Sequence, residues 1–321
     1  RELSSPGFVA EIETLPPLTF QPEWGVEVCK TVVDIIREHE AKYGIRGAVR
    51  ITPNDIREGR DLTHMWRGRH WDAMMETFEG CARAGADFLA IESVGGKEIH
   101  DDAIMQCDLA ASIYALSVLG CRDMEVLWTA IGGIADKTGA RSAGDTACGF
   151  ANTAMVLAEK NYIPRVFAAV VRVVAAVRSL VAVECGASGP HKDCGYEGVY
   201  VKAISGIPIA MEGKTAACAH LSPVGNVAAC AADLWSNESI QNIKLLGGMA
   251  PTVFFEQLVY DCRLMNQASA RGPEGALMLR DWLADSDSRL DPQAYVLRPD
   301  VALDIAKGIV AEEGDYNRAR A

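Results

Sequence analysis

Short apolar runs alternate along this chain with longer segments of helical periodicity, and this alternation limits the fold more than any other feature. No hairpin turn joins two of these runs, and the best of them are almost continuously apolar. Such runs are typical of parallel strands that are buried on both faces beneath helices. We predict strands at residues 47–51, 86–92, 124–131, 179–185 and 206–211.

Helices are predicted where apolar residues recur at a spacing of three or four. The segments are residues 24–43, 71–84, 101–119, 150–160 and 163–177. Prolines in residues 1–23 predict an extended N-terminal segment, and the glycines of residues 132–149 predict a loop. The longest apolar run, 166–183, is interrupted by Arg172 and Arg178, which indicates a helix running into a strand rather than a membrane span.

The positions of the reactive residues favour a barrel over a doubly wound sheet. No glycine-rich phosphate loop follows an early strand. Carboxylates and cysteines instead follow several well-separated strands, and the sites of TIM (β/α)8 barrels lie at the C-terminal ends of their strands. We therefore expect residues 1–321 to form a single TIM-barrel catalytic domain, in which residues 285–321 are a helical C-terminal extension.

Net charge and cysteine content limit the kinds of partner that the protein can bind and the cellular compartment in which it is expected. The formal net charge of −12 disfavours nucleic acids and anionic membrane surfaces as partners. Ten cysteines in 321 residues are too few for a disulfide scaffold, and no signal peptide precedes them. Together these observations favour a cytoplasmic protein with reduced thiols.

Reactive side chains gather in residues 184–197, which hold two cysteines, a histidine, a lysine, an aspartate and two glutamates. Cys194 from this stretch, Glu92 at another predicted strand end and Cys148 in the glycine-rich loop form a ligand set that suits Zn²⁺. Three protein ligands leave a fourth position for water or substrate, which marks a catalytic zinc site. By spacing alone the choice stays open. The competing ligands are Glu184, Cys185, Cys218 and His220.

Several longer motifs resemble those of a known family. The main ones are Gly-Asp-Thr-Ala-Cys-Gly-Phe-Ala-Asn-Thr-Ala-Met at 144–155, Gly-Pro-His-Lys-Asp-Cys-Gly-Tyr-Glu at 189–197 and Met-Glu-Gly-Lys-Thr-Ala-Ala-Cys-Ala-His at 211–220. Residues 233–238 and 260–267 agree with the same family. Over nearly its whole length, the chain resembles the zinc-containing MtaB subunits of the methanol:corrinoid methyltransferases.

The resemblance implies a TIM barrel with one zinc ion at its mouth, held by one glutamate and two cysteines. Carried onto this chain, the metal ligands and catalytic residues are Glu92, Cys148 and Cys194. The neighbouring His191 and Lys192 are expected either to face the corrinoid or to lie behind the metal ligands. Family members are longer at both ends, so part of the N-terminal region of the barrel is expected to be missing.

The implied activity is methyl transfer from methanol to the Co(I) of a corrinoid carried by a separate, MtaC-like corrinoid protein. It would be the first step of methanol use in methanogenesis or acetogenesis. Zinc would bind the methanol oxygen and improve it as a leaving group. The chain has no Asp-x-His-x-x-Gly motif for cobalamin, which agrees with a corrinoid brought by a partner. A homodimer at the core of a larger complex is also implied.

Two other classes of function are weighed against this one. A metal-dependent barrel hydrolase would attack an ester or amide with zinc-bound hydroxide. Hydrolase sites favour histidine and aspartate, however, and the chain has six histidines and no His-x-His pair. A non-enzymatic metal-binding protein fits less well, because an open site with three ligands has no structural purpose.

Overall fold

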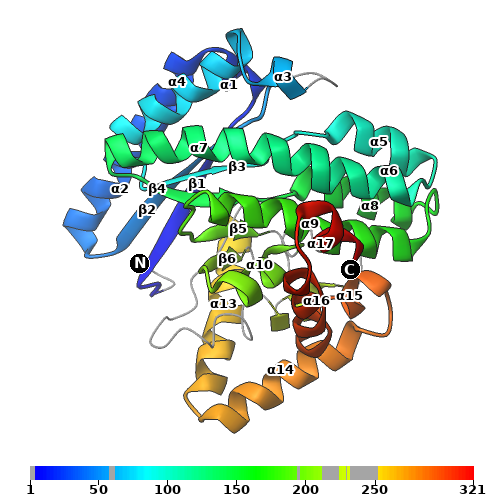
Figure 1. Cartoon of the computed structure of the whole chain (residues 1–321). Helices are drawn as coiled ribbons and strands as arrows, with labels where there is room; N and C mark the ends of the chain where they lie inside the picture. Colours follow the sequence, from blue (N-terminus) through cyan, green and yellow to red (C-terminus); the bar gives the residue numbers. More distant parts are fainter. Residues whose placement is uncertain (1–3, 58–61, 194–195, 212–223, 229, 232–251) are drawn as a thin grey trace.

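Every strand pair in the described part of the chain is parallel (Figure 1). The computed structural model describes residues 4–57, 62–193, 196–211, 224–228, 230–231 and 252–321. One sheet has the order β1 (Gly7–Thr14), β2 (Arg46–Pro53), β3 (Phe88–Ile91) and β4 (Arg141–Asp145). A second sheet pairs β5 (His191–Asp193) with β6 (Ile209–Met211). The predicted α/β class with parallel strands is confirmed.

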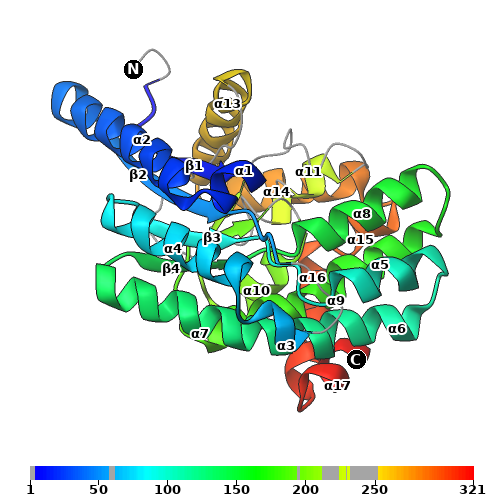
Figure 2. The same cartoon turned by 90° about the horizontal axis from the view of Figure 1, so that it is seen from above.

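Helices alternate with the strands and pack against them (Figures 1 and 2). Those in contact with strands include α2 (Pro22–Tyr43), α4 (Arg69–Arg83), α7 (Gly120–Thr138) and α10 (Gly198–Ser205). Helix α2 ends at Gly44, whose φ of +68° is the left-handed conformation common after a helix. The remaining elements are α1 (Pro16–Phe20), α3 (Leu62–Met65), α5 (Lys97–Met105), α6 (Leu109–Tyr114), the π-helical turn η1 (Ala115–Leu119), α8 (Cys148–Glu159), α9 (Arg165–Glu184), α11 (Gly225–Ala228), α13 (Thr252–Ser269), α14 (Pro273–Asp287), α15 (Pro292–Tyr295), α16 (Pro299–Ala311) and α17 (Asp315–Arg320).

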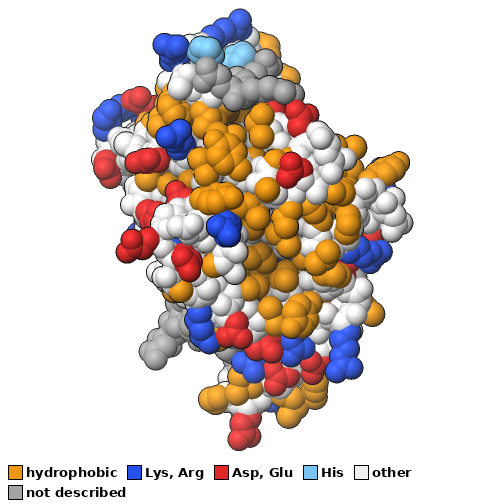
Figure 3. Space-filling model, turned by 45° about the vertical axis from the view of Figure 1, so that its right-hand side comes forward, with side chains coloured by type: hydrophobic (Ala, Val, Ile, Leu, Met, Phe, Trp, Pro, Cys, Tyr) orange, Lys and Arg blue, Asp and Glu red, His pale blue; other side chains and the backbone are white. Residues whose placement is uncertain are grey.

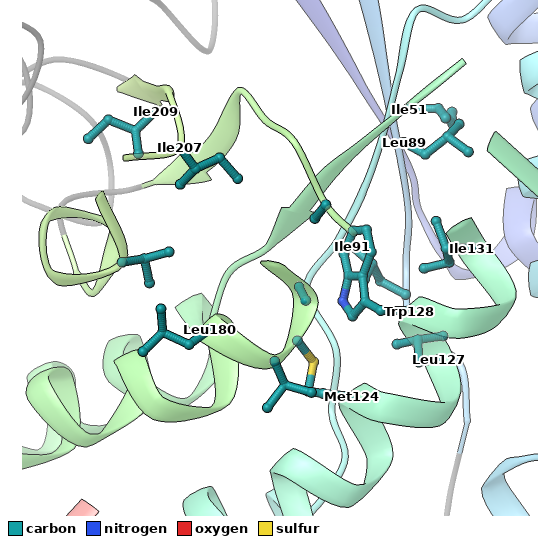
Figure 4. Close-up of a cluster of buried hydrophobic side chains, with 14 of the residues drawn as sticks. Ile51, Leu89, Ile91, Met124, Leu127, Trp128, Ile131, Leu180, Ile207 and Ile209 are labelled. Carbon is teal, nitrogen blue, oxygen red and sulfur yellow. The ribbon is translucent and has the colours of Figure 1, made fainter. Parts of the chain in front are cut away.

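The main core lies between the sheet and α7 (Figure 4). The side chains of α7 that enter it recur at spacings of three and four, which places them on one face of the helix. They include Met124, Leu127, Trp128 and Ile131. The predicted strand at 124–131 is therefore wrong. The apolar run resembled a buried strand because a run of this length is compatible with either a buried strand or a segment of a buried helix.

Helix α9 replaces another predicted strand. It runs without a break through residues 179–184, so the strand expected at 179–185 is also wrong. The helix is apolar on nearly all sides because the core and the neighbouring helices α8, α10 and α15 surround it. It is long and apolar enough to cross a membrane, but 78% of its most apolar window is buried inside the protein.

Two strands form where other structure was predicted. Strand β4 lies within residues 132–149, predicted as a loop, and its Arg-Ser-Ala-Gly-Asp sequence lacks the large apolar side chains that mark a strand. Residues 1–23, predicted as an extended segment, contain β1, α1 and the start of α2. Strand β1 pairs with β2 along its full length, so this segment belongs to the sheet.

The sheet is strongly curled. A backbone hydrogen bond from Ser188 N–H to Ser142 O, 2.8 Å long, places the approach to β5 beside β4. The side chain of Arg50 on β2 nevertheless donates to Pro190 O just before β5, at 2.9 Å. In a flat sheet these segments would be about 14 Å apart, given a strand spacing of roughly 4.8 Å. Strands β2 and β5 therefore face each other across an interior.

The C-terminal residues are helical. Helices α15, α16 and α17 occupy most of residues 285–321 and pack against α9 and α10. Large apolar side chains are exposed on helices α5, α6 and α9, and Figure 3 shows apolar side chains gathered on this side of the molecule. They include Met105, Leu109, Tyr114 and Val166.

Candidate active site

The three predicted metal ligands follow three successive strands. Glu92 comes directly after β3, Cys148 three residues after β4, and Cys194 directly after β5 in the sequence. Strand β3 pairs with β4, and β5 contacts β4. The side chain of Glu92 is 33% exposed and Cys148 is buried. Cys194 itself lies outside the described residues, and among those described no three His, Cys, Asp or Glu side chains form a metal-binding group.

Buried hydrogen bonds fix the loop after Glu92. The backbone N–H and the hydroxyl of Ser93 each donate to Asp145, at 3.0 Å. Arg178 donates to Ser93 Oγ at 2.7 Å and lies 3.4 Å from Asp145 Oδ2. Burial raises the pKa of Asp145 to about 7, although Arg178 acts to lower it. Since Asp145 ends β4 three residues before Cys148, this network ties the backbone around Glu92 to the backbone around Cys148.

Cys148 is the first residue of helix α8, where the helix dipole favours a negative charge such as a thiolate. The turn before it is held by buried Glu197, whose Oε1 accepts from Ala147 N–H at 2.6 Å and from the Ser179 hydroxyl at 2.8 Å. Cys148 also belongs to an apolar cluster with Tyr196. Tyr196, two residues after Cys194 in the sequence, therefore packs in the same cluster as Cys148.

Lys192 lies on the other side of Cys194 in the sequence and contacts Glu92. Its Nζ is 2.7 Å from Glu92 Oε1, and the lysine is only 1% exposed. The same Nζ is 2.7 Å from Glu13 Oε1 and 3.0 Å from Glu11 Oε1, both on β1. The side chain of Lys192 is thus enclosed by three carboxylates rather than exposed at the surface.

His191 is fully buried beside β4. A Cβ added to Gly144 would lie 2.7 Å from His191 Nδ1, so glycine is needed at this contact. Neither ring nitrogen of His191 has a hydrogen-bond partner among the described residues. Burial, helped by the nearby Arg50, lowers the pKa of His191 to about 3. The ring is therefore neutral near pH 7 and does not carry a proton for the reaction as an imidazolium.

Acid is expected to destabilise the protein through His191. Its pKa of about 3 in the folded state lies below the ordinary value of 6.5, so the unfolded state binds more protons between these two pH values. The contribution of His191 to the free energy of unfolding is fully present above about pH 6.5 and decreases as the pH is lowered. At pH 3 the loss from this group alone is roughly 4 kcal/mol. Urea unfolding between about pH 7 and about pH 4 should show a weaker pH dependence for His191→Phe than for the wild type.

The control for this experiment is His39→Phe, which removes a histidine at an exposed position. It should retain the acid sensitivity of the wild type. Equal pH dependence in the wild type and His191→Phe would show that acid acts on another group.

The competing ligands are placed away from this site or lie outside the described residues. Glu184 and Cys185 are at the C-terminal end of α9, before β5 begins, where Glu184 binds Arg318 at 2.9 Å. Parallel strands place this end of the helix opposite the strand ends that carry Glu92 and Cys148. Cys218 and His220 lie outside the described residues.

Sequence reasoning missed the carboxylates of β1. Glu11 and Glu13 alternate with apolar residues in Ala-Glu-Ile-Glu-Thr, and a period of two would have placed both on one face of a strand. Glu197 was noted only as a member of the reactive stretch. Its role in holding the turn before Cys148 depends on a contact between residues 50 positions apart, which no local pattern indicates.

Comparisons with known proteins agree with this geometry. A sequence model of the family described as methanol-cobalamin methyltransferase B subunit matches residues 1–321. The chain is 43% identical over 325 aligned residues to the methanol–corrinoid protein co-methyltransferase of Methanosarcina barkeri, covering 99% of this chain and 69% of that protein. It also resembles a chain in the crystal structure of the methanol:cobalamin methyltransferase complex MtaBC from Methanosarcina barkeri, with a TM-score of 0.85 and 38% identity. That match covers 99% of this chain and 70% of the other.

Proposed function

This chain belongs to the methanol-cobalamin methyltransferase B subunit family, and from that premise we propose that a zinc ion held by Glu92, Cys148 and Cys194 activates methanol in it. Its activity is methyl transfer from methanol to the corrinoid of a partner protein. The matching family and both similar proteins are described as methyltransferases, so the alternative of a metal-dependent hydrolase has no support.

The observation that carries the zinc proposal is the pair of contacts on either side of Cys194. Lys192, two residues before it, binds Glu92, and Tyr196, two residues after it, packs with Cys148. The described residues on the two sides of Cys194 in the sequence therefore contact the two other proposed ligands. Two cysteines and one carboxylate suit Zn²⁺, and three protein ligands leave one position for a substrate oxygen.

The bound zinc would act as a Lewis acid on the methanol oxygen, since hydroxide is otherwise a poor leaving group. The protein supplies position and charge. The network of Ser93, Asp145 and Arg178 holds the loop of Glu92, and Glu197 holds the turn of Cys148. The start of α8 favours the thiolate of Cys148.

The fold proposed with this site is a TIM barrel that further strands complete. The support is the strand order, which follows the chain from β1 to β4 with β5 beside β4, together with the contacts across the curled sheet. A doubly wound sheet would instead reverse its strand order near the middle. In a barrel, Glu92 and Cys148 lie at the mouth formed by the C-terminal ends of the strands.

The partner that brings the corrinoid is a corrinoid protein, which we propose docks over this mouth so that cobalt can reach the methyl group. A dimer of this chain is proposed as the core of the complex. Its support is the exposed apolar surface on helices α5, α6 and α9, since surfaces of this kind commonly mark protein interfaces. Light scattering of the purified chain would measure its oligomeric state.

The activity is tested by mixing the protein with methanol and a corrinoid protein in the Co(I) state. The visible spectrum should change to that of methyl-Co(III). A spectrum that stays unchanged at every methanol concentration, while another methyl donor reacts, would overturn methanol as the substrate. The ligand set is tested by metal analysis. Cys194→Ser should lose zinc and Cys185→Ser should keep it, and the reverse result would move the ligand to Cys185.

A further inference from the structure

Three carboxylates meet at the amino group of Lys192. Its Nζ lies 2.7 Å from Glu13 Oε1, 2.7 Å from Glu92 Oε1 and 3.0 Å from Glu11 Oε1. A lysine ammonium has three N–H donors, so each donor can serve one of these carboxylates. Lys192 belongs to β5, and its side chain lies inside the curled sheet. Its amino group there links β1 to the end of β3.

The contacts on the β1 side hold Lys192 in place. Glu11 also accepts from the Thr52 hydroxyl at 2.6 Å and lies 3.7 Å from Arg50. Burial acts to raise the pKa of Glu11, but Lys192 and Arg50 outweigh it and hold the pKa below its ordinary value. Glu11 is therefore an ionised, fixed partner, and the orientation of the lysine does not depend on Glu92 alone.

We propose that Lys192 is a positioning residue that occupies Oε1 of Glu92, so that Glu92 offers the metal a single oxygen and the remaining position stays open for methanol. This inference depends on the proposed zinc site. A carboxylate can bind a metal through one or both oxygens. With two thiolates and a substrate oxygen, a glutamate bound through both oxygens would make the site five-coordinate, crowd the substrate position and weaken the bond between methanol and the metal.

Lys192 has a second effect on the same carboxylate. Its positive charge, in a buried site where charges interact strongly, draws negative charge away from the metal side of Glu92. Glu92 becomes a weaker donor, and the zinc ion keeps more of its power to polarise an oxygen. Removing Lys192 should therefore leave metal binding intact while slowing methyl transfer, which is the opposite of the effect of removing a ligand.

The test uses the protein loaded with Co²⁺ in place of zinc, since the visible bands of Co²⁺ report the number of ligands. In the wild type, intense bands of a four-coordinate site are expected, and methanol should shift them. In Lys192→Met, one metal per chain should remain, with the weaker bands of a five-coordinate site and a diminished response to methanol. Methyl transfer should fall by about 10- to 100-fold, the usual effect of losing a group that orients a metal ligand.

Two variants serve as controls. Lys192→Arg keeps the charge and should keep most of the four-coordinate spectrum. Lys202→Met removes another buried lysine, whose Nζ donates to Gly206 O at a distance of 3.1 Å and does not contact these carboxylates. This variant should leave the spectrum unchanged. If Lys192→Met fails to fold, the double variant Lys192→Met with Glu11→Gln removes one charge of each sign and should give the same five-coordinate spectrum.

The results separate this inference from the zinc site on which it depends. A Co²⁺ protein without the charge-transfer bands of thiolate ligands would overturn the proposed metal site itself. Thiolate bands in the wild type, together with an unchanged Co²⁺ spectrum in Lys192→Met, would overturn only the role of Lys192. Loss of the metal from folded Lys192→Met would also overturn it, since a lysine that only limits Glu92 to one oxygen is not needed for binding.

Discussion

Cys148→Ala is expected to lose its bound zinc and to transfer methyl groups from methanol at least about a thousandfold more slowly than the wild type. Zinc can lower the pKa of bound water from about 15.7 to about 7. This shift corresponds to a stabilisation of the leaving oxygen on the order of 10 kcal/mol. Losing only about 4 kcal/mol of this stabilisation slows the reaction about a thousandfold. Metal analysis and the rate of methyl-Co(III) formation measure the two effects.

The matched control is Cys121→Ala. Cys121 is also buried, on α7, where its thiol donates to Leu116 O at 3.9 Å. Both substitutions remove one sulfur atom from a packed interior and leave a small cavity, so both should lower the free energy of unfolding by a similar amount. The control should keep its zinc and most of its activity. Full zinc content in folded Cys148→Ala would show that Cys148 is not a ligand.

Local sequence patterns were sufficient for the strands whose side chains are large and apolar. β2 and β3 contain Val49, Ile51, Leu89 and Ile91, all buried. Strand β4 was missed because small residues fit where it passes close to His191, and small residues resemble a loop. Helix α7 was mistaken for a strand because tertiary packing, rather than the composition of eight residues, decides between the two.

The prediction of the candidate site depended less on correct secondary structure than the prediction of the fold did. Glu92 and Cys148 follow the ends of adjacent strands even though the strand before Cys148 was not recognised. The motifs around them were long enough to carry a family resemblance without correct secondary structure. The supporting network could not be predicted in the same way. Ser93, Asp145 and Arg178 meet only in the folded chain, and the contact from Arg178 to Ser93 joins residues 85 positions apart.

Arg178→Met is expected to reduce the free energy of unfolding by about 3–5 kcal/mol near pH 8, because it leaves the carboxyl group of Asp145 buried without its cation. The pKa of Asp145, about 7 with Arg178 present, lies above the ordinary value of 3.8, so the folded state binds more protons between these pH values. Stability therefore falls as the pH rises through this range, and without Arg178 the fall should extend to higher pH. Urea unfolding near pH 6 should accordingly show a smaller loss than near pH 8.

The control for Arg178→Met is the double variant with Asp145→Asn, which removes the acid together with its cation. Its loss of stability should be smaller than that of Arg178→Met and should not change between about pH 6 and about pH 8, since the asparagine cannot titrate. An equal, pH-independent loss in both variants would mean that Arg178 stabilises the protein through its packing on the Phe150 ring, 4.5 Å away, rather than through Asp145. In that case Arg178 would not contribute through Asp145 to the link between the loops of Glu92 and Cys148, and the hydrogen bonds from Ser93 to Asp145 would form that link alone.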